Sequence, residues 1–511
     1  MNLRLTIPNV GRTKTTRRKL FDLHSWVGFQ LAVFMTLVVA TGTFAVVSNE
    51  IDWLIHPELR SSVGENKADW AQIESAIRSY EPNHVLAGLS KQEASYFTHK
   101  ATMISPQGER YYLYVDPYTG AIAGRTGTLT VQRFLRDLHR YLFMPGIIGL
   151  PLVTTVSIML LLSLFTGLKT VRNWKTVATR IRLAKGMRVA VGDFHKFAGL
   201  WSSWFFILII ATSFWYFAEL MARVGGAAFE PSRPGITEER AASFGPTVQL
   251  ADSATLVAAA EKAFPGFQAT HVDFAVRAKL ASSVLGRHND LMVRSRANRI
   301  FLDPVDASVI HIQRSHELSW IAYLNELADP LHFGSFGGLT TKVIWFIFGL
   351  VMLSLTVTGV WLSWKRLRSR SPTIAQWASV PLLLVVVVFA VPYLQRQMDD
   401  GRFQISQSFT KSLDDTFHLT LTLQQDPKGA ALGPFLLGLQ SDFGRINLAE
   451  AELHLVCELC KQVKTLKPRV IGQSILLKDV FSKQQLTNAN SVDIKLTFLS
   501  GESVDTKIKL E

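Results

Sequence analysis

The chain has 511 residues, 48% of them hydrophobic, and a mean hydropathy of +0.19. This length allows several domains, and this apolar content excludes an ordinary soluble protein. The net charge of +14 would suit a nucleic-acid partner, but Lys and Arg concentrate just outside the apolar runs, as in 17–19, 169–188 and 365–368. That distribution is typical of the cytoplasmic flanks of membrane spans. We therefore expect a lipid bilayer as partner and no nucleic acid.

Membrane-spanning helices need about 20 mostly apolar residues. Five runs meet this requirement, the fifth only marginally: 24–47, 147–169, 197–220, 342–364 and 377–395. No small-residue cleavage site follows the first run, so we do not expect a removed signal peptide. The basic flanks predict a cytoplasmic N-terminus (1–19), span 1 (20–48), an external domain (49–130), an external helix with span 2 (131–170), a cytoplasmic loop (171–192), span 3 (193–220), a second external domain (221–326), span 4 (327–364), a cytoplasmic loop (365–376), span 5 (377–395) and an external C-terminal domain (396–511).

The first and third spans begin with the same motif. The segment Asp22-Leu23-His24 is followed by Gly28, and Asp193-Phe194-His195 is followed by Gly199, at an offset of 171 residues. The matching continues into both apolar runs. We interpret the chain as a duplication built around a histidine at the edge of the membrane.

Each of these spans is followed by an expected external domain with a helical pattern, strand-like segments and an Asp-Pro turn. Alternating apolar residues beside Pro and Gly turns favour strands, so each domain is expected to be α+β. A Leu-His pair then precedes each returning span. The two copies contain the helical patterns 70–80 and 253–264, the strand-like segments 111–115, 270–276 and 299–302, the turns Asp116-Pro117 and Asp303-Pro304, and the pairs Leu138-His139 and Leu331-His332.

Two spans with an external domain between them make one unit, which starts and ends in the cytoplasm. The two units therefore have the same orientation, and a pseudo-twofold axis along the membrane normal would relate them. Such an axis brings equivalent positions together. We expect His24 to face His195 near the cytoplasmic side, and His139 to face His332 near the external side.

Ionisable residues at membrane spans are costly and are candidates for function. Two facing imidazoles can supply both axial ligands of a haem iron, and a porphyrin fits between the helices of a bundle. The two pairs formed by His24, His195, His139 and His332 thus predict two b-type haems. Gly28 and Gly199 lie on the same helical faces as their histidines and would let a flat macrocycle approach the backbone. Taken singly, each histidine could instead cap a helix or bond a carbonyl, but four equivalent ones favour ligation.

The segment from 377 onward has no copy in the other half. Alternating residues at 417–423 and 492–496 predict a mostly-β C-terminal domain. Within it, Cys457 and Cys460 are followed by Lys461 rather than the His of a c-type haem site. In an oxidising compartment they form either a short structural disulfide or a thiol–disulfide active site. Two cysteines alone cannot make the usual four-ligand structural zinc site.

No Gly-rich dinucleotide fingerprint follows a strand at the start of a helix, and nothing resembles a flavin domain. Electrons are therefore expected from a quinol or a separate protein. A transporter that carries a substrate across the membrane is a further alternative. It would have polar or broken helices at mid-membrane, and the apolar runs contain little beyond small Thr and Gly interruptions.

The order of these motifs over about 17–370 resembles the PepSY-associated transmembrane helix family. Several motifs in the same order carry the resemblance: the D-x-H-x-x-x-G span, the Asp-Pro turn, L-H-R-Y-L-F at 138–143, D-F-H-K-F-A-G-L-W at 193–201, L-H-F-G-S-F-G-G at 331–338 and T-G-V-W-L-S-W-K-R at 358–366.

The resemblance implies PepSY-like external domains, di-haem b centres and a bacterial inner-membrane protein that reduces ferric siderophores, or another ferric chelate, in the periplasm during iron uptake. The fifth span and the tail depart from the simplest members. An alternative is a PepSY-domain anchor that binds or regulates an envelope peptidase. An anchor has no need for four matched histidines.

Overall fold

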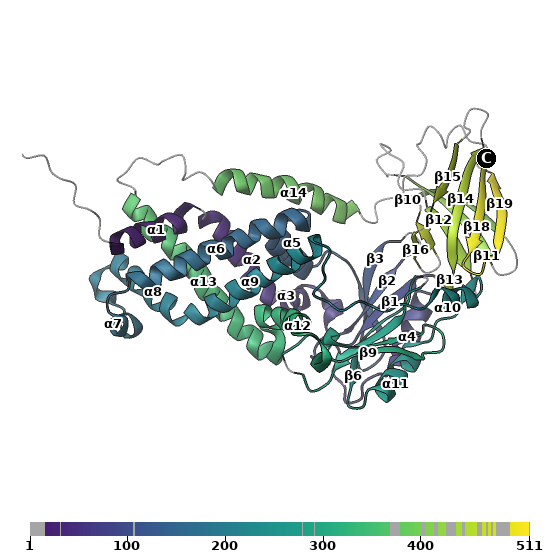
Figure 1. Ribbon diagram of the computed structural model, residues 1–511, viewed down its shortest axis with the longest axis horizontal. Coiled ribbons are helices and arrows are strands. Elements are labelled where there is room, and N and C mark those ends of the chain that lie inside the picture. The colour runs from purple at the N-terminus through teal and green to yellow at the C-terminus, as the bar shows by residue number, and fades with distance from the viewer. Residues whose placement is uncertain are drawn as a thin grey trace, which may run out of the picture. The chain divides into compact units, whose positions relative to one another are not determined.

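The fold comes from a computed structural model. It describes residues 16–30, 32–92, 94–105, 108–277, 279–290, 292–367, 379–399, 404–412, 417–425, 436–441, 445–456, 462–466, 469–471, 474–476 and 491–509. Cys457 and Cys460 lie outside these residues, so their predicted pairing stays a prediction. The chain divides into two compact units, and Figure 1 labels many of their elements. We call residues 1–48, 134–228 and 331–391 the helical unit, and residues 49–133, 229–330 and 392–511 the sheet unit.

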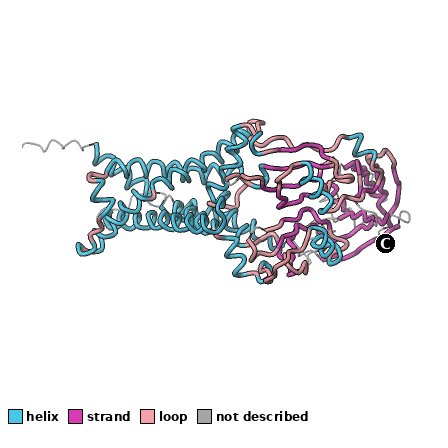
Figure 2. The backbone as a smooth tube through the Cα atoms, turned by 90° about the horizontal axis from the view of Figure 1, so that it is seen from below, coloured by secondary structure: helices cyan, strands magenta, loops and turns pink. Residues whose placement is uncertain are grey.

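The helical unit is a bundle whose helices run side by side (Figure 2). Its elements are α1 (Thr16–Gln30), α2 (Ala32–Val46), most of α5 (Val131–Tyr141), α6 (Gly146–Thr170), α7 (Trp174–Thr179), α8 (Met187–Trp201), α9 (Ser203–Val224), the end of α12 (Trp320–Phe333), α13 (Gly338–Leu367) and the start of α14 (Ser379–Asp399).

Three helices within the described part of the chain are long and apolar enough to cross a membrane, namely α6, α9 and the helix at Ser335–Lys365. The number rises to four if the bent pair Thr16–Phe29 and Val33–Val46 counts as one span. Large apolar side chains on these helices, such as Ile147, Phe165 and Ile347, are more than half exposed. Such a surface suits lipid rather than water. A membrane helical region is therefore present, as the sequence predicts.

The predicted fifth span falls on α14, a helix of 21 residues. Its apolar portion among the described residues, Leu384–Leu394, is shorter than a bilayer requires. The fifth span therefore stays a prediction.

Packing in the helical unit joins helices both within each half of the chain and between the two halves. Helix α2 packs against α13, α9 packs against α6, and α1 and α8 pack against α6 and α13 respectively. The core forms where the larger apolar side chains of these helices interlock. Its most buried members include Phe34, Leu142, Val156, Phe205 and Met352.

The sheet unit contains one eight-stranded antiparallel sheet with the strand order β4-β3-β2-β1-β6-β7-β8-β9. The sequence predicts two separate external domains. In the structure the strands of both belong to one continuous sheet, because β1 pairs with β6, with Leu89 opposite Val272. This pairing removes an open edge from each half. The strands are β1 (Val85–Ser90), β2 (His99–Ile104), β3 (Arg110–Val115), β4 (Ile122–Gly127), β6 (Gln268–Asp273), β7 (Ser282–Arg287), β8 (Asn298–Leu302) and β9 (Val309–Gln313).

Two equivalent helices, α4 (Trp70–Tyr80) and α11 (Ser253–Ala263), share one hydrophobic core with this sheet. Each begins at an aspartate that accepts a backbone hydrogen bond three residues ahead, Asp69 from Gln72 and Asp252 from Thr255, both at 2.7 Å. Such caps satisfy backbone N–H groups that a helix leaves unpaired at its start. The unit also contains α3 (Ser48–Ile55) and α10 (Glu238–Ser243).

The C-terminal region forms further β-sheets, as the sequence predicts. One has the order β10-β11-β12-β17-β16 and another the order β15-β14-β18-β19, while β13 pairs with β5 (Thr247–Val248). The strands are β10 (Gln404–Ser412), β11 (Phe417–Gln425), β12 (Leu436–Ser441), β13 (Arg445–Ile446), β14 (Leu448–Val456), β15 (Gln462–Leu466), β16 (Arg469–Ile471), β17 (Ser474–Leu476), β18 (Ser491–Phe498) and β19 (Ser503–Lys509).

Candidate functional site

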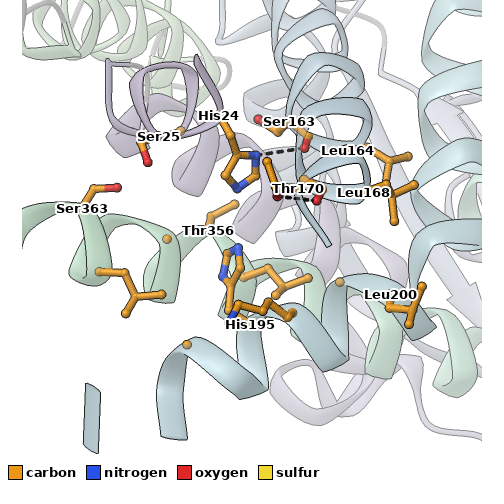
Figure 3. A pocket seen from close by; sticks show the side chains of 18 of the residues that line it. His24, Ser25, Ser163, Leu164, Leu168, Thr170, His195, Leu200, Thr356 and Ser363 are labelled. Carbon is orange, nitrogen blue, oxygen red and sulfur yellow. Dashed lines mark hydrogen bonds between the residues drawn. The ribbon is translucent and has the colours of Figure 1, made fainter. Parts of the chain in front are cut away.

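The structure brings His24 of α1 and His195 of α8 together inside the helical unit. Their ring centres are 6.2 Å apart and their planes cross at 75°. Figure 3 shows the two rings directed toward each other across a gap between the helices. The residues are far apart in sequence, so only the packing of the two halves creates this arrangement.

Hydrogen bonds hold both of these rings at Nδ1. His24 Nδ1 lies 3.0 Å from the carbonyl oxygen of Ser163, and His195 Nδ1 lies 2.9 Å from Oγ1 of Thr358. A carbonyl can only accept, and Thr358 already donates its proton to the carbonyl of Ser354 at 2.7 Å. Nδ1 is therefore the protonated nitrogen in both neutral rings, and Nε2 carries the lone pair that a metal needs.

His139 of α5 and His332 of α12 form a second pair with the same spacing. Their ring centres are also 6.2 Å apart, with an angle of 41° between the planes. His139 Nδ1 lies 2.9 Å from the carbonyl oxygen of Val38, and His332 Nδ1 lies 2.8 Å from Oγ1 of Thr212. Thr212 donates its proton to the carbonyl of Leu208 at 2.9 Å. The same tautomer follows for this pair.

The ring-centre spacing of both pairs equals the spacing expected for two imidazoles that bind one metal ion from opposite sides. When a metal ion lies in line between two imidazole nitrogens, each metal–nitrogen bond is about 2.0 Å and each nitrogen is about 1.1 Å from its ring centre. The two ring centres are then about 6.2 Å apart. The hydrogen bond at Nδ1 is the usual outer support of a metal-bound imidazole. Among the residues that the structure describes, there is no group of three or more His, Cys, Asp or Glu side chains that could hold a metal ion. Each histidine pair by itself offers two ligands.

A cavity of about 380 Å³ surrounds the His24–His195 pair. Much of its wall is apolar, from residues such as Met35, Leu160 and Phe206, and the cations Arg188 and Lys196 also line it. Gly28 and Gly199 line this cavity as well, and a Cβ added at either would meet no atom within 4 Å. The backbone at both positions is therefore open to the cavity.

Three other glycines lie directly against the histidine rings, and the sequence analysis did not assign them. A Cβ at Gly167 would lie 3.3 Å from Cε1 of His24, one at Gly359 would lie 3.4 Å from Cε1 of His195, and one at Gly42 would lie 2.5 Å from Cε1 of His139. The signal for two of them was the Thr-Gly pair that ends both returning spans, at 166–167 and 358–359.

A comparison with known protein families matches residues 21–366 to the family described as PepSY-associated TM region. The match covers both histidine pairs and the strands β1 to β9. A comparison with curated proteins finds no match.

Proposed function

Because the chain belongs to the PepSY-associated transmembrane family, we propose that it is a di-haem electron-transfer protein of the bacterial inner membrane. Each histidine pair would hold one b-type haem, His24 with His195 and His139 with His332. The observation that carries this proposal is the repeated geometry. Two pairs from separate parts of the chain have the same 6.2 Å spacing between ring centres, and in both pairs the hydrogen bonds at Nδ1 leave the lone pair on Nε2.

The internal repeat supports the same conclusion. Each half supplies one histidine to each pair, and each half supplies four strands to the eight-stranded sheet in mirrored order. The Asp-Pro turns repeat in detail as well. Asp116 N–H donates to the carbonyl of Ala121 and Asp303 N–H donates to that of Ser308, both at 2.8 Å. A duplicated two-span unit with an axis along the membrane normal accounts for these correspondences.

The proposed reaction is the reduction of a ferric chelate, such as a ferric siderophore, to its ferrous form in the periplasm. Each iron takes one electron, and bis-histidine haems supply one-electron transfer when they are bound. The protein's part is to hold the ligands. Its Thr and carbonyl acceptors fix the imidazole tautomers, and much of the wall of the His24–His195 cavity is apolar. A quinol or a separate protein would supply the electrons.

The assigned positions of the pairs support a direction of transfer. His24 follows the basic segment 17–19, which we assign to the cytoplasm. His139 and His332 adjoin the segments that carry the sheet unit, which we assign to the periplasm. Electrons would enter at the His24–His195 pair and leave at the His139–His332 pair.

The test begins with the full chain purified from haem-sufficient cells. We expect the spectrum of b-type haem and about two haems per chain, because each pair offers one axial set. The reduced protein should then transfer electrons to an added ferric chelate, which a ferrous-specific dye detects. A double variant, His24→Ala with His139→Ala, is the control for reduction without haem. A folded wild-type protein without pigment would contradict the proposal.

A further inference from the structure

A second cavity, of about 500 Å³, lies where α6 ends and α8 begins. Four cationic side chains line it, Arg172, Arg180, Arg182 and Lys196, together with one carboxylate, Asp193. It therefore differs from the largely apolar cavity around His24 and His195. A wall with this charge favours an anionic ligand.

The one carboxylate in the wall is already engaged. Asp193 is buried and accepts hydrogen bonds from Nε and Nη2 of Arg182 at 2.8 and 2.9 Å. Lys196 Nζ lies 3.7 Å from the same carboxylate. Across the described ranges, no carboxylate pairs with Arg172 or Arg180. Two guanidinium groups thus remain to bind an anion from outside the protein.

Phosphate is the anion that suits these groups. A guanidinium presents parallel N–H donors whose spacing matches two oxygens of a phosphate, and such charge-assisted hydrogen bonds are among the strongest in proteins. The polar residues Thr170 and Thr176 also line the cavity. A phosphate could belong to a lipid headgroup or to a soluble compound.

The surrounding surface favours a lipid. The segment that forms the cavity carries large apolar side chains that are strongly exposed, with 46% of Trp174, 77% of Leu183 and 72% of Met187 accessible. In water this exposure is unfavourable, whereas beside a membrane these side chains can contact acyl chains. The cavity also directly follows the last turn of the candidate span α6. Basic pockets at the ends of spans suit anionic lipid headgroups.

We propose that this cavity binds the phosphate of an anionic phospholipid such as phosphatidylglycerol, through Arg172 and Arg180. The acyl chains extend over Trp174, Leu183 and Met187. Asp193 keeps Arg182 in the wall, and Lys196 borders both this cavity and the one that contains His195. The site rests on the charge and exposure of this segment and does not depend on haem.

Native mass spectrometry of the full chain in detergent measures lipid binding directly. The variant Arg172→Gln/Arg180→Gln removes the two guanidinium groups without changing the paired Arg182. The matched control, Lys175→Gln/Lys185→Gln, removes two cations from the same segment that do not line the cavity. We expect phosphatidylglycerol to bind about tenfold more weakly to the arginine variant and to change less than about threefold in the control. Equal losses in both variants would mean diffuse surface attraction and would overturn the proposal.

Two further arms identify the source of the phosphate. Phosphatidylcholine carries the same phosphate but its quaternary ammonium cancels the charge, so it should bind the wild type more weakly than phosphatidylglycerol and lose less affinity in the arginine variant. Glycerol 3-phosphate and flavin mononucleotide should not displace the lipid when each is added at the concentration at which phosphatidylglycerol saturates the site. Displacement by either soluble compound would show that the cavity takes a free phosphate compound and would overturn the lipid assignment.

Discussion

Thr358 accepts a hydrogen bond of 2.9 Å from Nδ1 of His195 and donates its own proton to the carbonyl of Ser354. This chain of two bonds fixes which nitrogen of His195 carries a proton. The residue that supports His195 therefore comes from the last turns of α13, the partner helix of α8.

Replacing Thr358 with Val removes the acceptor while keeping the shape of the side chain. We expect haem to remain bound at the His24–His195 pair but with an affinity about 10- to 100-fold lower, the usual loss when an outer partner of a metal ligand is removed. The midpoint potential of that haem should rise, because a less basic imidazole stabilises ferric iron less well. Haem titration and a redox titration measure the two effects. Thr155→Val, which removes only a bond to Leu152 on its own helix, should change neither.

The four histidines should act as two pairs. Changing His24 to Ala and changing His195 to Ala should remove the same spectral component, because either change takes one axial ligand from the haem proposed at that pair. Changing His139 or His332 removes the other component. Chelate reduction driven by the native donor should stop in all four variants, while dithionite should still support some reduction in the first two.

Optical difference spectra of the purified variants decide this prediction. His316→Ala, at an exposed position in the sheet unit, is the control and should retain both components. Loss of the same component in the His24 and His139 variants would mean that ligands are shared within one half of the chain, and the pairing would be wrong.

Gly42 leaves room for the ring of His139. An added Cβ would lie 2.5 Å from Cε1 of that ring and 2.8 Å from its Nδ1, so Gly42→Ala must displace the imidazole or strain α2. Overpacking of this kind costs about 1–3 kcal/mol. We expect selective loss of the haem component assigned to His139 and His332, measured by spectrum. Gly28→Ala, where a Cβ meets nothing within 4 Å, should leave that component unchanged.

Asp116 makes the stability of the sheet unit depend on pH. Burial alone would raise the pKa of its carboxyl, but hydrogen bonds from the N–H groups of Ser62, Thr119 and Tyr118 outweigh this effect and lower the pKa to about 2. A lowered pKa in the folded state stabilises the fold above the unfolded value of about 3.8. This contribution, about 2 kcal/mol, is lost as the pH falls from 4 toward 2.

Acid unfolding of wild type and Asp116→Asn checks this expectation. The variant should be less stable at pH 7, and its stability should fall less steeply between pH 4 and pH 2. Asp505→Asn, in β19 and outside both Asp-Pro turns, serves as the matched control. Parallel curves for wild type and Asp116→Asn in this window would contradict the prediction.

Hydropathy and repetition in the sequence already indicated a membrane protein, its family and four histidines of interest. The reason is physical: a span needs a long apolar run, and a costly histidine at the same place in two copies of a motif stands out against that background. Equivalent positions near a symmetry axis must meet, which allowed the pairs His24–His195 and His139–His332 to be predicted from the two repeated motifs. The family assignment is confirmed over residues 21–366.

Only the tertiary structure decided what surrounds those rings and how the strands associate. The acceptors Ser163, Val38, Thr212 and Thr358 are polar groups in apolar helices, and their role depends on rotation of each helix about its axis, which hydropathy leaves undetermined. The pairing of β1 with β6 depends on which edges remain open once each half has folded. In the same way, buried Arg445 of β13 bonds the carbonyls of Ala275 and Arg277. A charged residue buried by a segment distant in the chain follows no local pattern, because its stability comes from partners that only folding brings within reach.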